Sequence, residues 1–260
     1  MRLGLRQGVL EIRQFLRSRE QVVFTLAFPA IMILVFGSIF TGDIGAGVKF
    51  TQYFVTGMIA TGLMTAGFQA LAIQIPVERD RGVLKRLLGT PMPRWVYFAG
   101  KVLMVAFIAV LETVILLAVA TLLFGLDLPA TAGKWLTFLW VSALGITACT
   151  LCGIAFSSIA RTGRSAPAVV TPVALILQFI SGVFFVFTSL PGWMQNVAAL
   201  FPLKWMCQGL RSVFLPASFA AQEPGGSYDL PKVALVLGAW CLVALVLCLT
   251  TFRWTTRRDG

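Results

Sequence analysis

The sequence lacks histidine altogether and has only ten acidic residues among its 260 positions. Histidine is the commonest general base and the commonest metal ligand, so its absence removes much acid–base and metal chemistry. The sequence also contains neither the glycine-rich phosphate loop of nucleotide-binding proteins nor the G-x-S-x-G motif of serine hydrolases. We therefore expect no catalytic residues, no metal ligands and no cofactor on this chain.

Charged residues are scarce as well, at 12% of the chain, about half the usual share of roughly 25%. Hydrophobic residues make up 58%, and the mean hydropathy is +0.88. A water-soluble globule could not cover this much apolar surface with so few charges. Soluble enzymes, disordered chains and disulfide scaffolds are thereby excluded, which leaves a membrane protein that crosses the bilayer several times.

The few cysteines include one C-x-x-C pair, Cys149 and Cys152, which in other settings indicates redox or zinc chemistry. Here the pair lies inside an apolar run, and Gly145, Cys149 and Gly153 have the spacing of small residues at a close helix contact. We therefore interpret these cysteines as packing residues and expect no disulfide.

Six segments are long and apolar enough to cross a bilayer, which takes about 20 residues for roughly 30 Å of hydrocarbon. They are residues 22–40, 53–75, 102–124, 135–159, 166–187 and 233–252. After the fifth segment, residues 191–200 and 203–215 each form a helical pattern too short to span, which predicts re-entrant or interfacial helices. The predicted fold is thus all-α, with six transmembrane helices in one domain over residues 21–260.

The first 20 residues predict a separate amphipathic helix on the membrane surface. At about 100° per residue, four arginines fall within roughly 60° of one another beside an apolar stripe. They are Arg2, Arg6, Arg13 and Arg17. Arginines in this position reach lipid phosphates while the stripe enters the acyl boundary. The alternative is a basic tail that only sets the topology.

The net charge is +11, but the chain is too apolar for a nucleic-acid partner. Sixteen of the 21 basic residues lie in the N-terminal segment, in the loops after the second and fourth segments, and in the tail with Arg253, Arg257 and Arg258. The other five lie on the opposite side of the predicted membrane. Because basic residues collect on the cytoplasmic side, both termini are predicted to be cytoplasmic.

The loop at 78–91 is more elaborate than a passive connector. An acidic–basic run precedes a helical stripe of Val83, Leu84, Leu87 and Leu88, and Gly89 and Pro91 end that helix. A short helix offered to the cytosol indicates docking to a partner. We expect the stripe to anchor it there, and Glu78 and Arg79 to fix its angle by charged hydrogen bonds.

This order of features resembles the type 2 ABC-transporter permeases, the six-span subunits of bacterial exporters, and the drug-resistance exporters of the daunorubicin type most closely in layout. Nearly the whole chain takes part in the resemblance. The residues that fit the family's loop pattern, and that the resemblance assigns to ATPase coupling, are Glu78, Arg79, Asp80, Arg81, Gly82, Leu84, Leu87, Leu88 and Pro91. Asp80 stands where Glu is more usual, and Lys85 and Arg86 make the helix more basic than is typical.

The resemblance implies a permease subunit in the bacterial inner membrane. It implies pairing with a second permease, identical or similar, and with separate cytosolic ABC ATPase subunits that hold ATP and Mg²⁺. The substrate would be a hydrophobic or amphipathic molecule such as a drug, an antibiotic or a lipid-linked compound. The alternatives are an exporter of polysaccharide or glycolipid, which shares the fold, and an ion-coupled secondary transporter.

Candidate pathway residues are one carboxylate and several aromatic side chains. Glu112 is the only charge near the centre of a predicted span, which makes it a functional candidate; a protonated Glu hydrogen-bonded inside the bundle is the alternative. Phe28, Phe36, Phe179 and Phe184 are candidates for lining an apolar route. For each phenylalanine the alternative is packing or contact with lipid.

Overall fold

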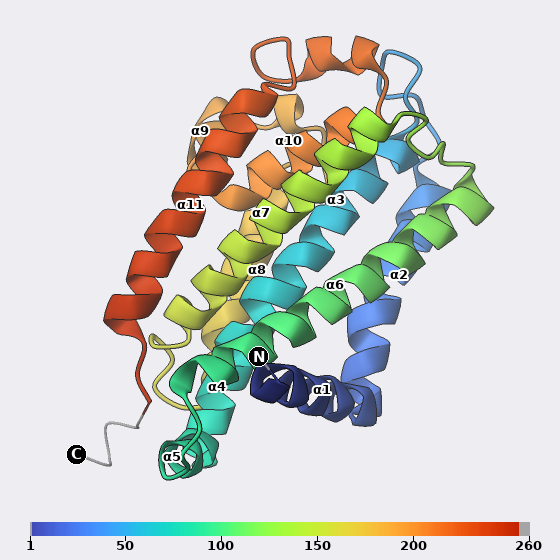
Figure 1. Ribbon diagram of the computed structural model, residues 1–260. Helices are drawn as coiled ribbons and strands as arrows, with labels where there is room; N and C mark the ends of the chain where they lie inside the picture. Colours follow the sequence, from blue (N-terminus) through green and yellow to red (C-terminus); the bar gives the residue numbers. More distant parts are fainter. Residues whose placement is uncertain (1, 255–260) are drawn as a thin grey trace.

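The computed structural model describes residues 2–254, so that Arg257 and Arg258 of the predicted basic tail lie outside the described part. Within this range the chain is helical, and its only extended pairing is an isolated bridge between Asp43 and Lys49. Figure 1 shows long helices side by side in one bundle, with α1 (Arg2–Arg17) lying across one end of it. The short helix α5 (Val83–Leu88) lies at the same end, which we call the α5 end.

Among residues 2–254, five helices are long and apolar enough to cross a membrane, and they coincide with five of the six predicted segments. They are α2 (Arg19–Ile39), the continuous run Phe50–Asp80, α6 (Arg94–Phe124), α7 (Ala132–Phe156) and α11 (Leu230–Thr251). The remaining segment, predicted over 166–187, forms the apolar helix α8 (Ala166–Ile180) of only 15 residues. It ends early because Gly182 takes a positive φ of 76°, which reverses the chain. A sixth span therefore stays a prediction.

The run Phe50–Asp80 is the centre of the bundle. It consists of α3 (Phe50–Met64), a π-helical turn η1 (Thr65–Gln69) and α4 (Ala70–Asp80). In the apolar 18-residue stretch of this run, 72% of the residues are buried. The corresponding share is 17% for α2 and 22% for α11. The outer helices thus expose apolar side chains along their length, as lipid-facing helices do.

Small residues let α7 approach this central run backbone to backbone. A methyl group on Gly153 would lie 2.7 Å from the carbonyl oxygens of Gly67 and Phe68, so only glycine fits. On the same face of α7, a methyl group on Gly145 would lie 2.8 Å from the side chain of Met206. The predicted small-residue face of α7 is therefore the face that packs on η1 and on α10 (Pro202–Phe214).

The shorter helices cover both ends of the bundle. At the end opposite α5, α9 (Gly192–Ala198) precedes α10, which is buried between α3, α7 and α11. Two short 3-10 helices, Phe187–Ser189 and Ala217–Gln222, complete the element order. The re-entrant character of α9 and α10, and the interfacial position of α1, remain predictions.

The close contact at Gly153 predicts that even one added methyl group at this position destabilises the protein. Gly153→Ala should destabilise the protein by about 1–3 kcal/mol, because its methyl group meets backbone atoms that cannot rotate away. Gly133→Ala is the matched control, since it lies on the same helix with no atom within 4 Å of the added methyl. Thermal unfolding in detergent measures both. Equal melting temperatures for the two variants would contradict the contact.

Candidate functional site

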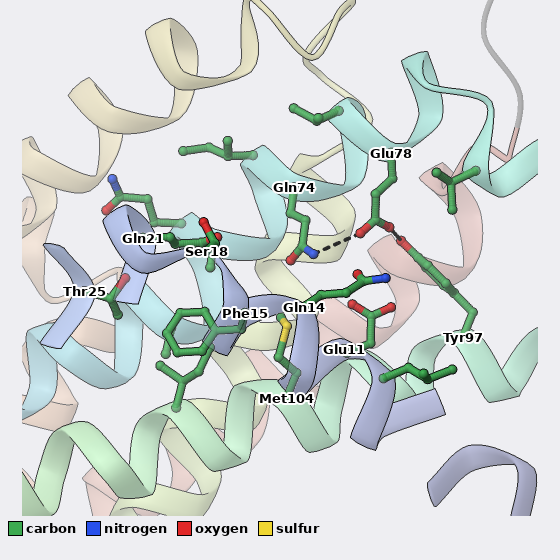
Figure 2. A pocket seen from close by; sticks show the side chains of 18 of the residues that line it. Glu11, Gln14, Phe15, Ser18, Gln21, Thr25, Gln74, Glu78, Tyr97 and Met104 are labelled. Atoms are coloured by element: carbon green, nitrogen blue, oxygen red, sulfur yellow. Dashed lines mark hydrogen bonds between the residues drawn. The ribbon is translucent and has the colours of Figure 1, made fainter. Parts of the chain in front are cut away.

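A cavity of about 870 Å³ lies at the α5 end, between α1, the start of α2, the lower part of the central run and α6. This volume is within the usual range for ligand sites, roughly 300–1,000 Å³. Figure 2 shows side chains from these elements converging on it, among them Gln14, Gln21 and Gln74. Apolar groups such as Phe15 and Met104 line the same space. Amides beside apolar walls suit a molecule with both polar and apolar parts.

A buried ion network closes one side of the cavity. The Nζ of Lys101 on α6 is fully buried and lies 2.8 Å from Glu11 Oε2 of α1. The same Nζ forms a second ion pair with Glu78 Oε1 of α4. The Tyr97 hydroxyl donates to Glu78 Oε2 at 2.8 Å, and the ammonium group lies 5.4 Å from the centre of the Tyr97 ring. Three separate elements are thereby joined through one ammonium group.

Two glutamine amides complete this network. Gln7 donates to Glu11 Oε1 at 3.0 Å, and Gln74 donates to Glu78 Oε1 at 2.9 Å, the second of these bonds being drawn in Figure 2. Both carboxylates therefore have several donors, which a buried charge requires. Sequence reasoning missed Glu11 and Tyr97, and it placed Lys101 only among the basic residues of the loop after the second predicted segment. The available signal was charge at positions predicted to lie in or beside apolar helices.

The next two residues of the acidic–basic run also bond within the chain. Arg79 Nε donates to the Arg253 carbonyl at 3.0 Å, and Arg79 Nη1 donates to the Ser157 carbonyl at 3.2 Å. Asp80 Oδ2 accepts a hydrogen bond of 2.6 Å from the Gly163 N–H. These bonds connect α4 to the ends of α7 and α11 and to the loop before α8. Glu78, Arg79 and Asp80 thus position helices of their own chain, and their part in ATPase coupling stays a prediction.

Only part of the predicted docking stripe is available for contact. Leu84 is fully buried in the chain's own core, and Val83 and Leu87 are partly buried and line the cavity. Gly82, with a φ of 70°, turns the chain between α4 and α5 and brings this face inward. The exposed side of this segment instead carries Arg81, Lys85, Arg86, Leu88 and Pro91.

The interfacial arginines are exposed, as their predicted role requires. They are Arg2, Arg6, Arg13 and Arg17. The opposite side of α1 packs on α6 through Gly4 and Gly8, whose positions meet Trp95, Ala99 and Leu103. The contact of the four arginines with lipid stays a prediction.

Three of the predicted pathway residues gather at the other end of the bundle. Phe36 of α2 stacks on Phe54 of α3 at 5.0 Å between ring centres, and Phe184 lies 6.1 Å from Phe36 and 4.9 Å from Phe179. Phe40 and Phe50, which sequence reasoning missed, extend this aromatic cluster. The members come from segments distant in sequence, so that spacing alone could not have grouped them.

The other two pathway candidates stand apart. Phe28 is 53% exposed and is outside the aromatic cluster. Glu112 is buried on α6 against Gly62 of α3, and neither of its carboxyl oxygens has a hydrogen-bond partner among the described residues. Glu112 lines neither the cavity nor the cluster. Its role in the pathway stays a prediction.

The network predicts that Lys101 is essential for stability. Lys101→Met leaves two buried carboxylates without their cation and should cost about 3–5 kcal/mol in unfolding free energy. Adding Glu11→Gln and Glu78→Gln should recover most of that loss, because no charge is then left unpaired. Lys232→Met, at an exposed lysine, serves as the control. Denaturation in detergent decides the matter: a Lys101→Met protein as stable as this control would refute the network.

Comparison with known proteins agrees with this architecture. Residues 9–215 match the family described as ABC-2 type transporter. The Escherichia coli (strain K12) "Inner membrane transport permease YadH" is 27% identical over 215 residues, covering 79% of this chain and 80% of that protein. The Bacillus subtilis (strain 168) "Putative transport permease YvfS" is 21% identical over 203 residues, covering 76% and 79%.

A third relative is longer. The E. coli (strain K12) "Probable multidrug ABC transporter permease YbhR" is 22% identical over 165 residues, which cover 63% of this chain but only 44% of that protein. The family match spans most of the chain and includes α5, the aromatic cluster and every residue that lines the cavity except Gln7. The chain therefore belongs to the ABC-2 type transporter family, as a multi-pass inner-membrane permease subunit of an ABC transporter.

Proposed function

We propose that this permease exports an amphipathic molecule, with ATP hydrolysis supplied by a separate ABC ATPase. The observation that carries the proposal is the 870 Å³ cavity at the α5 end, with amide and apolar groups on its walls. Val83 and Leu87 of α5 line the same cavity, so a movement of α5 would change its shape directly. The proposed substrate site would thereby lie next to the helix that is proposed to transmit motion from the ATPase.

The proposed topology places the α5 end in the cytoplasm. Most basic residues lie at this end, including the exposed arginines of α1 and those of the 78–94 loop. A substrate would then enter from the cytosol or the inner leaflet and leave past the aromatic cluster at the other end. A second permease copy would complete the route, with Phe28 on the exposed side of α2 available to it.

The drug-like substrate class has support from two relatives. YbhR and YbhS of E. coli both carry "multidrug ABC transporter permease" in their names. The mixed lining of the cavity agrees with such molecules, which have apolar rings and a few polar groups. An exporter of polysaccharide or glycolipid is the alternative, because it shares the fold.

The ATPase partner follows from the family and from the exposed side of α5. The sequence has no phosphate loop, so ATP and Mg²⁺ would be held by the partner. Arg86 and Leu88 are exposed beside Pro91, on a helix whose other side is fixed by Leu84. Motion of the ATPase would thus pass through a helix held firmly by its own chain.

Filling the cavity tests the proposed substrate site. Ala70 lines the cavity and is half-buried, so Ala70→Phe should abolish stimulation of ATP hydrolysis by amphipathic compounds while the ATPase still co-purifies. Ala239→Phe makes the same change at an exposed position of α11, remote from the cavity, and should respond like the wild type. Unaltered stimulation in Ala70→Phe would place the substrate site elsewhere.

Substitutions on α5 test the coupling surface. Arg86→Glu and Leu88→Asp change exposed groups, so each protein should fold and insert but lose at least about tenfold in affinity for the ATPase. Leu84→Asp should instead destabilise the permease itself, because it buries an unpaired charge. Lys232→Glu, an exposed charge at the opposite end, is the control. Co-purification of the ATPase gives the readout, and full assembly with both α5 variants would show that coupling lies elsewhere.

A further inference from the structure

A second cavity, of about 500 Å³, lies between the ends of α7 and α11, which run side by side in Figure 1. Its inner wall is apolar, with Phe68 of η1, Phe156 of α7 and Leu247 of α11. Its edge includes Ile159, which is 58% exposed. The cavity therefore opens sideways, among the apolar side chains that face the lipid. The proposed topology places it in the cytoplasmic leaflet.

The polar rim of this cavity is basic. Arg253 lines it and is exposed, and Arg161 and Arg164 are exposed on the loop that follows Ser158. The Ser158 hydroxyl also lines the cavity, and its oxygen is buried without a hydrogen-bond partner among the described residues. A buried hydroxyl without a partner leaves hydrogen-bonding capacity for a ligand.

Arg79 is a buried cation next to this cavity, although it is not one of the residues that line it. Its guanidinium group bonds to the carbonyls of Ser157 and Arg253, the two segments that border the cavity, and the residue is only 9% exposed. Its third nitrogen, Nη2, has no hydrogen-bond partner in residues 2–254, and no carboxylate there forms an ion pair with it. Asp80 partly compensates the charge of Arg79, and the unpaired nitrogen leaves a hydrogen-bond donor beside the cavity.

We propose that this cavity binds an anionic phospholipid of the cytoplasmic leaflet. The headgroup phosphate would accept hydrogen bonds from Arg253 and from Ser158, two polar residues that line the cavity, and Arg79 would add positive charge next to them. One acyl chain would lie along the wall formed by Phe68, Phe156 and Leu247. The cavity lies between the ends of α7 and α11, and Arg79 connects α4 to both of these ends, so the bound lipid would add to the contacts that hold the three helices together.

A lipid fits this site better than a free anion for two reasons. Most of the lining is apolar, which a small hydrated anion would leave unfilled. The opening also lies between side chains that face hydrocarbon, where a lipid is already present at high local concentration. Basic pockets between transmembrane helices on the cytoplasmic side are a known setting for phospholipid headgroups.

The test compares ligands on the full-length permease in detergent. The melting temperature is followed on titration with phosphatidylglycerol, with phosphatidylcholine and with inorganic phosphate. The site predicts a saturable rise with phosphatidylglycerol and at least about tenfold weaker effects of the other two, since only phosphatidylglycerol combines net negative charge with acyl chains. An equal rise with phosphatidylcholine, or an equal rise with inorganic phosphate, would overturn the proposal.

Variants locate the binding. Arg253→Gln and Ser158→Ala remove headgroup contacts but keep the backbone carbonyls that Arg79 uses, so both proteins should fold and bind phosphatidylglycerol about tenfold more weakly. Arg164→Gln removes an exposed arginine of the same loop that does not line the cavity, and should bind like the wild type. Unchanged binding in both rim variants, or an equal loss in Arg164→Gln, would overturn the proposal by pointing to general surface charge.

Discussion

The ammonium group of Lys101, buried between Glu11 and Glu78, is the interaction on which the α5 end of this permease depends. A fully buried cation is tolerated only where carboxylates and hydrogen bonds compensate for its lost hydration. Here one carboxylate comes from α1 and the other from α4, while the lysine belongs to α6. The requirement to pair this charge therefore fixes three helices relative to one another, and the cavity lies directly beside them.

This arrangement would let a six-residue helix transmit motion, as the proposed coupling to an ATPase requires. A helix as short as α5 has little stability of its own, because helix nucleation is costly. Leu84 anchors it in the core, and the bonds of Glu78, Arg79 and Asp80 hold the end of α4 just before it. A push on the exposed side of α5 would therefore move the walls of the cavity, instead of being lost in a flexible loop. The same rigidity extends through Arg79 to the end of α11.

Much of the helix order follows from the sequence, because long apolar runs and basic loops are local signals. The network does not, since Lys101 is 90 residues from Glu11 and 23 from Glu78, and no periodicity links them. The stripe of α5 shows a second limit. An apolar face on a helix indicates that the face is buried, but it does not tell which surface covers it. Leu84 is already buried by its own chain. The end of α8 depended on one conformation, the positive φ of Gly182, inside an unbroken apolar pattern.

Because Lys101 joins α6 to Glu11 of α1, these two helices should move as one unit beside α5. A disulfide between Gly4→Cys on α1 and Ala99→Cys on α6 tests it, because an added methyl on Gly4 lies 3.3 Å from the Ala99 methyl, close to disulfide geometry. The experiment uses a chain in which the five native cysteines are replaced, assembled with its ATPase. Oxidation should form the cross-link and leave substrate-stimulated ATP hydrolysis intact. Loss of that activity on oxidation, with recovery on reduction, would contradict the account.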